Sequence, residues 1–278
     1  MMSSCAVRQI SHLPPSPPPG TLLSATVSDL VQDVNDWSAK IDTLQAVVQF
    51  QATALLQQAG LEKQYHEIRG YILLKKPAQI RIQGEAPVVG TEIFDMVSDG
   101  RQFRLSIPPK NRFIEGQDDY RGPEPGGFEN LRPQHILEAL LIAPINPNAQ
   151  YFVEQVERHA RLYYVLTVVE PEGPGRLRLR RRIWFDRTDL RVSRVEIFGA
   201  RGKLEEDARY SGYGDFQGVS YPSQIVLSRP EEGYILIIQF QKVDFNAEIA
   251  PEKFILPRPR HAKLVRLGEA KVGSASDR

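Results

Sequence analysis

The sequence predicts a mainly β (α+β) fold built from one large antiparallel sheet, and three observations lead to this prediction. Short segments carry apolar residues at every second position, which is typical of strands with one buried face. Hairpin-length turns separate many of these segments, as at Ser98-Asp99-Gly100. Two other segments repeat apolar residues three and four positions apart, which indicates helices. Roughly eleven strands would then form one curled sheet, an unclosed β-barrel.

The expected strands follow one another along most of the chain. Within them, Ile80 and Ile82 alternate with polar residues, and Phe103, Leu105 and Ile107 do the same after the Ser98-Asp99-Gly100 turn. We expect strands at 44–56, 65–74, 79–83, 91–97, 103–107, 162–169, 177–185, 192–198, 207–213, 223–227 and 234–243. The polar stretch from Gln117 to Arg132 is rich in glycine and proline and predicts a mobile loop.

The two predicted helices are amphipathic. The first is capped by Ser24 or Thr26, and its apolar stripe consists of Val27, Leu30, Val31, Val34, Trp37, Ile41 and Leu44. The second spans 133–142, with Pro133 in its first turn and an apolar face of Ile136, Leu137, Leu140 and Leu141. The concave side of a curled sheet is where such helices fit. A sheet too wide for its helices to fill leaves an apolar pocket there.

Composition narrows the class of protein further. The 278 residues are 41% hydrophobic and carry a net charge of +1, so a sizeable core is expected and a nucleic-acid partner is not. No stretch approaches the roughly 18 uninterrupted apolar residues of a membrane span. A single cysteine excludes a disulfide framework, and the five histidines lack metal-ligand spacing. We therefore expect neither a metal nor a cofactor.

The lone cysteine, Cys5, follows small residues and precedes a proline-rich stretch that ends at Gly20. Small residues before a cysteine resemble the end of a bacterial lipoprotein signal peptide, where the cysteine becomes lipidated. The hydrophobic core of such a signal is missing, and the alternative is a loose thiol on a frayed terminus. Prolines behind a lipid would form a semi-rigid spacer. We assign 1–23 to a lipoprotein N-terminus and tether, 24–260 to the folded domain, and 261–278 to a flexible tail.

The turn between the strands at 79–83 and 91–97 has an unusual tip. Pro87 and Gly90 form the turn, and Val88 and Val89 stand at its end. Apolar tips cost free energy in water unless a membrane surface or an apolar ligand receives them. The alternative is that both valines fold back on a neighbouring strand.

The arginines between 176 and 182 form a basic segment that could either face solvent or bind an anionic partner. Strand alternation puts Arg176, Arg178, Arg180 and Arg182 on one face, with Leu177, Leu179 and Ile183 on the other. A solvated convex face with partners such as Glu170 or Glu196 is the plain interpretation. Contact with lipid phosphates or an acidic partner is the alternative.

An enzymatic function is not expected. Asp118, Asp119, Glu124 and His135 lie close together in sequence, but the composition of their loop explains the carboxylates without catalysis. No nucleophile with a neighbouring base and no phosphate-binding glycine loop can be identified. We therefore name no catalytic residue.

Several segments together resemble a known family, the bacterial lipoprotein-localisation proteins of the LolA/LolB-like superfamily. The resemblance covers most of 26–259 and depends on the order of the pieces. These are the helix-then-strand opening, Lys75 to Ile82, Ala86 to Glu92, Val97 to Gly100, Gly212-Tyr213, Tyr221-Pro222, Val243 to Asn246 and Phe254 to Pro257. The features of Cys5 and of the turn at Val88 make the chain more similar to the outer-membrane receptor LolB than to the periplasmic carrier LolA.

The resemblance implies a half-open barrel lidded by the two helices, with a cavity for the acyl chains of lipoproteins or other lipids. It also implies a lipid-anchored monomer on the outer membrane, facing the periplasm, that receives its cargo from a LolA-like carrier. Cys5 would be the lipidated residue, and Pro87, Val88 and Val89 the loop that enters the inner leaflet of the outer membrane. As cavity-lining residues we expect Trp37, Ile80, Ile82, Phe94, Leu140, Leu141 and Trp184.

Two departures from the family pattern bear on this reading. The tip residue is usually larger than valine, and the 117–132 loop is longer and richer in glycine and proline than expected. Two alternatives therefore stay open. One is an envelope stress sensor or scaffold with the same fold, and the other is a carrier of a different lipid or glycolipid.

Overall fold

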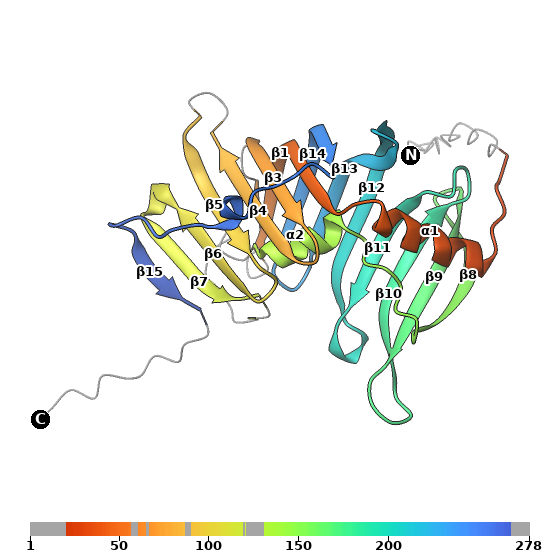
Figure 1. Cartoon of the computed structure of the whole chain (residues 1–278). Coiled ribbons are helices and arrows are strands. Elements are labelled where there is room, and N and C mark those ends of the chain that lie inside the picture. The colour runs from red at the N-terminus through yellow and green to blue at the C-terminus, as the bar shows by residue number, and fades with distance from the viewer. Residues whose placement is uncertain are drawn as a thin grey trace, which may run out of the picture.

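A computed structural model describes residues 21–56, 61–64, 67–86, 90–118, 120 and 131–267 of the chain. One sheet of fifteen strands dominates it, and Figure 1 shows the strands following a single curved path. Two α-helices accompany the sheet, α1 (Val27–Ala39) and α2 (Pro133–Leu140). The strands are β1 (Thr43–Leu56), β2 (Leu61–Gln64), β3 (Ile68–Lys75), β4 (Gln79–Glu85), β5 (Glu92–Ser98), β6 (Gln102–Ile107), β7 (Arg112–Gln117), β8 (Gln150–Arg158), β9 (Arg161–Pro171), β10 (Leu177–Asp186), β11 (Val192–Phe198), β12 (Leu204–Phe216), β13 (Val219–Arg229), β14 (Tyr234–Phe245) and β15 (Lys263–Arg266).

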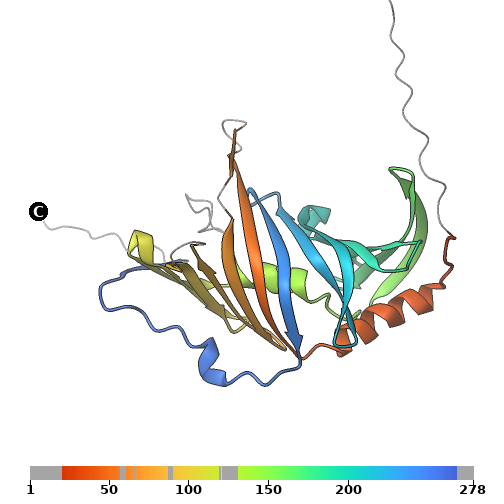
Figure 2. The same cartoon turned by 90° about the horizontal axis from the view of Figure 1, so that it is seen from above.

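The order of the strands confirms the predicted fold class. It runs β15-β7-β6-β5-β4-β3-β1-β14-β13-β12-β11-β10-β9-β8, with β2 paired to β1. Neighbours along this path are antiparallel except β15 and β7, which are parallel. Seen from above in Figure 2, the sheet is curled and unclosed. The long β1 pairs with both β3 and β14, and so joins the two halves of the sheet.

The strand count was underestimated, because β2, β7, β8 and β15 were not predicted. The sequence of β8 does not alternate apolar and polar residues, because the strand has no buried face that would require apolar side chains. Strand β15 lies within the segment 261–278 that the sequence assigned to a flexible tail. Its Val265 packs against the main core, and Leu264 packs against a small cluster of Val97, Phe113 and Leu256.

Helix α1 begins where the sequence predicted. Thr26 Oγ1 accepts a hydrogen bond from the Asp29 amide at 3.2 Å, and Asp29 Oδ2 accepts one from the Thr26 amide at 2.7 Å. This reciprocal capping box satisfies two amides that a helix start otherwise leaves open. The helix ends at Ala39, so Leu44 of the predicted stripe belongs to β1. No helix in the described part of the chain is long and apolar enough to cross a membrane.

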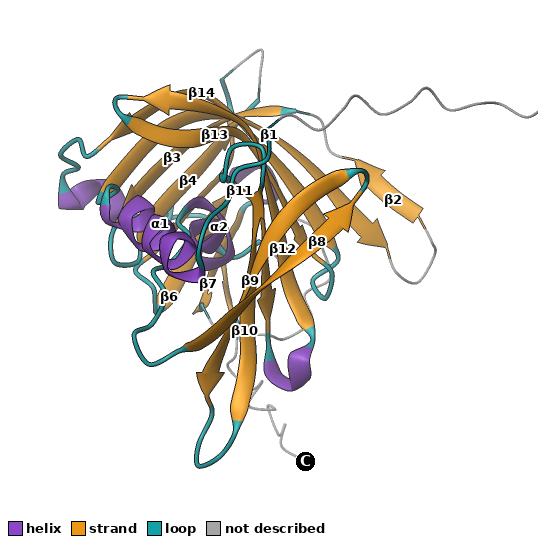
Figure 3. Cartoon of the chain, turned by 90° about the vertical axis from the view of Figure 1, so that its right-hand side faces the viewer, coloured by secondary structure: helices purple, strands orange, loops and turns teal. Residues whose placement is uncertain are grey.

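Both helices contribute to one core on the concave side of the sheet. Leu30 and Val34 of α1 and Ile136 and Leu140 of α2 belong to the same buried cluster as the inward-facing residues of the strands. Figure 3 shows both helices within the curl of the sheet. The interior that the resemblance assigned to a ligand is therefore the place that α2 occupies here.

Candidate functional site

The candidate site is the concave interior beneath α2, which packs against β4, β5 and β13. The inward side of α2 is apolar, with Ile136 at 1% exposed and Leu140 at 0%. Pro133 starts the helix without needing an amide partner, as predicted from the sequence. Burial of the side chains of Ile136, Leu137 and Leu140 contributes roughly 5–9 kcal/mol to holding α2 in place.

Two tyrosines of the sheet hold the C-terminal end of α2. Tyr210 Oη donates to the Ala139 carbonyl and Tyr221 Oη donates to the Leu140 carbonyl, each at 3.0 Å. The last carbonyls of a helix have no partner within it, so these two hydroxyls satisfy groups that burial would otherwise penalise. Burial also raises the pKa of both phenols well above the ordinary value, which keeps them protonated as donors.

The linker after α2 is held by an arginine of β10. Arg181 donates from Nη1 to the Ala143 carbonyl at 2.7 Å and from Nη2 to the Pro144 carbonyl at 2.8 Å. Burial lowers the pKa of Arg181 to about 10, so it stays charged at neutral pH. The next residue, Ile145, donates its amide to Asn35 Oδ1 of α1 at 2.8 Å. The linker is thereby tied both to the sheet and to the other helix.

Helix α1 reaches the same place through an aromatic stack. The rings of Trp37 and Tyr221 lie 5.8 Å apart and are tilted by 7°, and Trp37 Nε1 donates to the Ser220 carbonyl at 2.9 Å. Tyr221 therefore contacts α1 with its ring and α2 with its hydroxyl. A movement of either helix therefore disturbs Tyr221, which also holds the other helix.

A buried group of charged residues lies beside α2. Arg229 Nη1 lies 3.2 Å from Glu206 Oε2, and Arg229 Nη2 lies 2.8 Å from Glu232 Oε1. Arg229 Nη2 also donates to His135 Nε2 at 3.1 Å, since an arginine can only donate. The proton of a neutral His135 ring then sits on Nδ1, 3.4 Å from Tyr234 Oη. This group of residues connects α2 to β13 and β14.

Two carboxyl groups near Arg229 have raised pKa values. Burial, with the charge of Glu138 as the second cause, raises the pKa of Glu206 to about 8. Burial likewise raises the pKa of Glu138 on α2. Glu206 Oε1 is buried and accepts no hydrogen bond among the described residues. A neutral Glu206 beside Glu138 removes the repulsion that two buried carboxylates would exert across the contact between α2 and β12.

Most of the predicted lining residues come together on the concave side. Ile80 and Ile82 of β4 have no exposed surface, and Phe94 is 5% exposed. A Cβ at Gly84 would collide with the Phe94 ring, so the glycine lets that ring lie flat on β4. Leu140, Leu141 and Trp37 belong to the same core cluster or pack against it. Trp37 is only partly buried, but the other five side chains have almost no accessible surface, so the interior is closed in this structure.

Trp184 is the exception among the predicted lining residues. It lies between Ile183 and Phe185, which face the core, so alternation turns its ring to the convex face. There Trp184 Nε1 donates to Glu196 Oε2 at 2.8 Å, and Arg194 lies over its ring. Cys5 and the loop residues Pro87, Val88 and Val89 lie outside the described residues.

The arginine run does not keep one alternation. The pairing of β10 with β9 shifts between Leu179, opposite Val169, and Arg181, opposite Val168. Ile183 pairs with Leu166, so Leu179 and Ile183 fall on opposite faces, contrary to the prediction. This bulge turns Arg181 inward to the linker after α2. Of the predicted partners, Glu170 lies 4.0 Å from Arg180, whereas Glu196 pairs with Arg194 at 2.9 Å.

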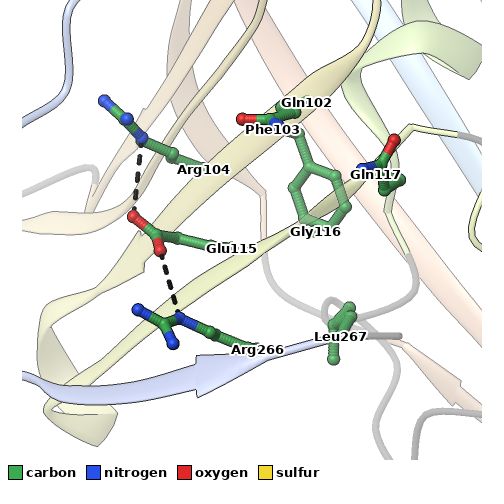
Figure 4. A pocket seen from close by; sticks show the side chains of 8 residues that line it. All are labelled: Gln102, Phe103, Arg104, Glu115, Gly116, Gln117, Arg266 and Leu267. Carbon is green, nitrogen blue, oxygen red and sulfur yellow. Dashed lines mark ion pairs between the residues drawn. The ribbon is translucent and has the colours of Figure 1, made fainter. Parts of the chain in front are cut away.

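A pocket of about 300 Å³ lies at the other end of the molecule, between β6, β7 and β15 (Figure 4). Its lining is Gln102, Phe103, Arg104, Glu115, Gly116, Gln117, Arg266 and Leu267. Glu115 lies between Arg104 at 3.6 Å and Arg266 at 3.8 Å. The side chains of Arg104, Glu115 and Arg266 are all substantially solvent-exposed. We assign no ligand to it. Among the described residues, no group of three or more His, Cys, Asp or Glu side chains is placed to hold a metal ion.

The anchoring residues of α2 were not identified from the sequence. Tyr210 was only part of a predicted strand, and Tyr221 was only part of the Tyr221-Pro222 segment of the family resemblance. Nothing in the sequence indicates that their hydroxyls reach carbonyls 71 and 81 residues away. Glu206 and Arg229 were not identified either. The available signal was the position of Arg229, which continues the buried alternation of Ile225 and Leu227 in β13.

Comparison with solved structures places the fold among LolA-like proteins. A LolA superfamily protein from Nitrosomonas europaea is 14% identical, with a TM-score of 0.50, and the match covers 81% of this chain and 97% of that chain. A DUF1329 family protein from Desulfovibrio piger is 12% identical, with a TM-score of 0.52 and coverage of 82% and 95%.

A third structure extends this likeness. A domain from Vibrio parahaemolyticus that bears the name of an outer-membrane lipoprotein-sorting protein is 11% identical, with a TM-score of 0.50 and coverage of 82% and 97%. No family model matches the sequence, and no curated protein matches it. At these identities the comparison establishes the LolA-like fold of this chain.

Proposed function

We propose that this protein binds the acyl chains of lipoproteins in the concave interior beneath α2 and helps deliver them to the outer membrane. The observation that carries the proposal is that one short helix, bound by an apolar face and a few identifiable polar contacts, covers the apolar wall formed by β4, β5 and β13. Support also comes from the LolA-like fold.

The free energies of the exchange are compatible with this function. An acyl chain gains about 0.8 kcal/mol for each methylene that leaves water, so roughly twelve methylenes contribute about 10 kcal/mol. That is similar to the 5–9 kcal/mol, roughly, that the apolar face of α2 contributes. An acyl chain can therefore take the place of α2 without any covalent chemistry, and the helix can return when the chain leaves.

Delivery requires contact with a membrane, and we assign that contact to Val88 and Val89. We further propose that Cys5 carries a lipid, that the protein faces the periplasm at the outer membrane, and that a LolA-like carrier supplies its cargo. The turn that holds the two valines joins β4 to β5, and both strands also form the wall beneath α2. A membrane contact at this turn would therefore be continuous with the binding interior.

The opening of α2 can be measured with a buried thiol. In a Cys5→Ser background, Ile82→Cys has no accessible surface while α2 is seated, so maleimide labelling of the folded protein reports displacement of the helix. We expect labelling to accelerate when a fluorescent palmitoyl lipid is added, and in Arg181→Met without lipid. Val97→Cys is the control, because Val97 is buried beneath the C-terminal segment and not beneath α2.

The same lipid gives the binding readout. We expect saturable binding by the unmodified chain, and faster binding by Arg181→Met. Trp184→Phe, on the convex face, should leave the rate of lipid binding and the rate of maleimide labelling unchanged. An unmodified protein that binds no palmitoyl lipid, together with an Ile82→Cys label that is indifferent to lipid, would exclude the proposed function.

A further inference from the structure

Strand β8 ends the sheet on one side and has no neighbour beyond it in the described chain (Figure 1). None of its nine residues is buried, and Tyr151 and Phe152 are 44% and 53% exposed. An edge strand offers a row of backbone donors and acceptors to any strand that can align with it. Its side chains decide which strand that is.

The turn after β8 determines which backbone groups point outward. His159 and Ala160 form a two-residue turn with φ of 52° and 58°, and Arg158 and Arg161 close it. In such a hairpin the closing pair exchanges hydrogen bonds, so Arg158, Val156 and Glu154 direct their backbone groups toward β9. The intervening residues, Glu157 and Gln155, direct theirs away from the sheet.

A second copy of β8 fits this edge in a register that matches its charges. With a two-fold axis through Val156, the two Val156 side chains meet, Gln155 of each copy hydrogen-bonds Glu157 of the other, and Glu154 of each copy faces Arg158 of the other. The alternation of backbone groups permits this register. Placing the axis through Glu154 would oppose two glutamates, and placing it through Gln155 would pair Arg158 with Phe152 and leave Glu154 opposite a valine.

The charges needed for this pairing are available. Glu154, Glu157 and Arg158 are exposed, and no ion pair within the described part of the chain engages them. Gln155 Oε1 accepts a hydrogen bond from Arg187 at 3.0 Å, which leaves its amide N–H groups to donate to a carboxylate.

We propose that two copies of this chain associate through β8, in an antiparallel and two-fold symmetric pairing that continues one sheet into the next. Closed two-fold contacts of this kind are the common form of self-association. An interface made by one strand edge buries less than about 1,200 Å², so the pairing belongs to the weak complexes and is favoured by confinement on a surface. This inference does not depend on the proposed lipid-binding function.

A charge exchange tests the register. Sedimentation of the full chain at up to roughly 200 µM should show a monomer–dimer equilibrium. Glu154→Arg and Arg158→Glu should each weaken it at least about tenfold, because each brings like charges together twice. The double variant should restore dimerisation, and Glu248→Arg, an exposed residue far along the chain, should leave it unchanged.

Two further variants separate this pairing from a folding defect or another interface. In a Cys5→Ser background, Val156→Cys should form a disulfide between copies, whereas Glu154→Cys should not. Gln155→Pro should be folded by circular dichroism yet monomeric, because its lost N–H points away from β9. A monomeric unmodified chain, a dimer indifferent to the charge changes, or cross-linking of Glu154→Cys in place of Val156→Cys would overturn the proposal.

Discussion

Tyr221 is the residue of the sheet that contacts both helices. Its ring stacks on Trp37 of α1, and its hydroxyl satisfies the Leu140 carbonyl of α2. The rings of Phe240 and Phe245 also meet it edge-on, with centroids 5.3 and 5.1 Å away. Its position is therefore fixed on several sides, and removal of the hydroxyl alone affects α2.

We predict that Tyr221→Phe lowers the free energy of unfolding by about 1–3 kcal/mol, because the buried Leu140 carbonyl loses its donor. Urea unfolding measures this loss. Tyr163→Phe is the matched control, since Tyr163 is half-buried and its hydroxyl has no hydrogen bond among the described residues. Equal stabilities of the two variants would show that the hydroxyl does not hold α2.

Glu206 makes the stability of the closed form depend on pH. Its pKa is raised from 4.5 to about 8 in the folded chain, so its contribution is fully present below 4.5 and is lost as the pH rises through 8. The groups around it include Glu138 and His135 of α2, Tyr210, Arg229, Glu232 and Tyr234.

We predict that Glu206→Gln removes most of this pH dependence and is more stable than the unmodified chain at pH 9 by more than about 1 kcal/mol. Denaturant titrations at pH 5, 7 and 9 measure the effect. Glu252→Gln, on an exposed residue, should follow the unmodified chain. A Glu206→Gln curve parallel to the unmodified one would refute the assignment.

At the scale of single elements, the proposed function depends on the β4–β5 hairpin and on α2. We have proposed the turn at Val88 and Val89 as the membrane contact and α2 as the removable cover of the interior. The two meet on the same strands, because α2 packs against β4 and β5. Substitutions in the turn should therefore affect delivery and leave binding in the interior intact.

We predict that Val88→Glu combined with Val89→Glu leaves the fold unchanged but abolishes delivery of lipoproteins to membranes, since carboxylates at the tip cannot enter a bilayer. Transfer of a labelled lipoprotein to liposomes measures the effect. Pro174→Glu, in the exposed β9–β10 turn, is the control. Normal delivery by the double variant would rule out the turn as the membrane contact.

The elements that could be predicted from sequence are those with one buried face. Alternation identified β3 and β4, and three- and four-residue spacing identified both helices. The exposed strand β8 and the short β15 could not be found this way, because neither shows alternating burial. The bulge at Arg180 could not be predicted either, and it placed Leu179 and Ile183 on opposite faces of β10.

Within the site, sequence indicated which side chains are apolar and which of them share a face. Ile80, Ile82, Phe94, Leu140 and Leu141 met on the concave side for that reason. The polar contacts that hold α2 depend on distant pairs such as Tyr210 with Ala139, and these follow only from the assembled fold. The face on which Trp184 lies could not be predicted from its residue type, because a tryptophan in a strand can lie on either face of the sheet.

At the scale of the whole molecule, the curl of the sheet creates the interior and the long β1 strand connects its halves. Solved structures of proteins from three bacteria share this architecture at 11–14% identity. At such low identity, what these structures share with this chain is the curled shape of the sheet and few of its side chains.

The most direct test of the account is the identity of whatever fills that interior in cells. Mass spectrometry of the protein purified from bacterial membranes should find an acyl lipid or lipoprotein bound, and Ile82→Cys in the loaded protein should react with maleimide because α2 has been displaced. Protein that carries no lipid, binds no palmitoyl lipid afterwards and keeps Ile82→Cys unreactive would contradict it.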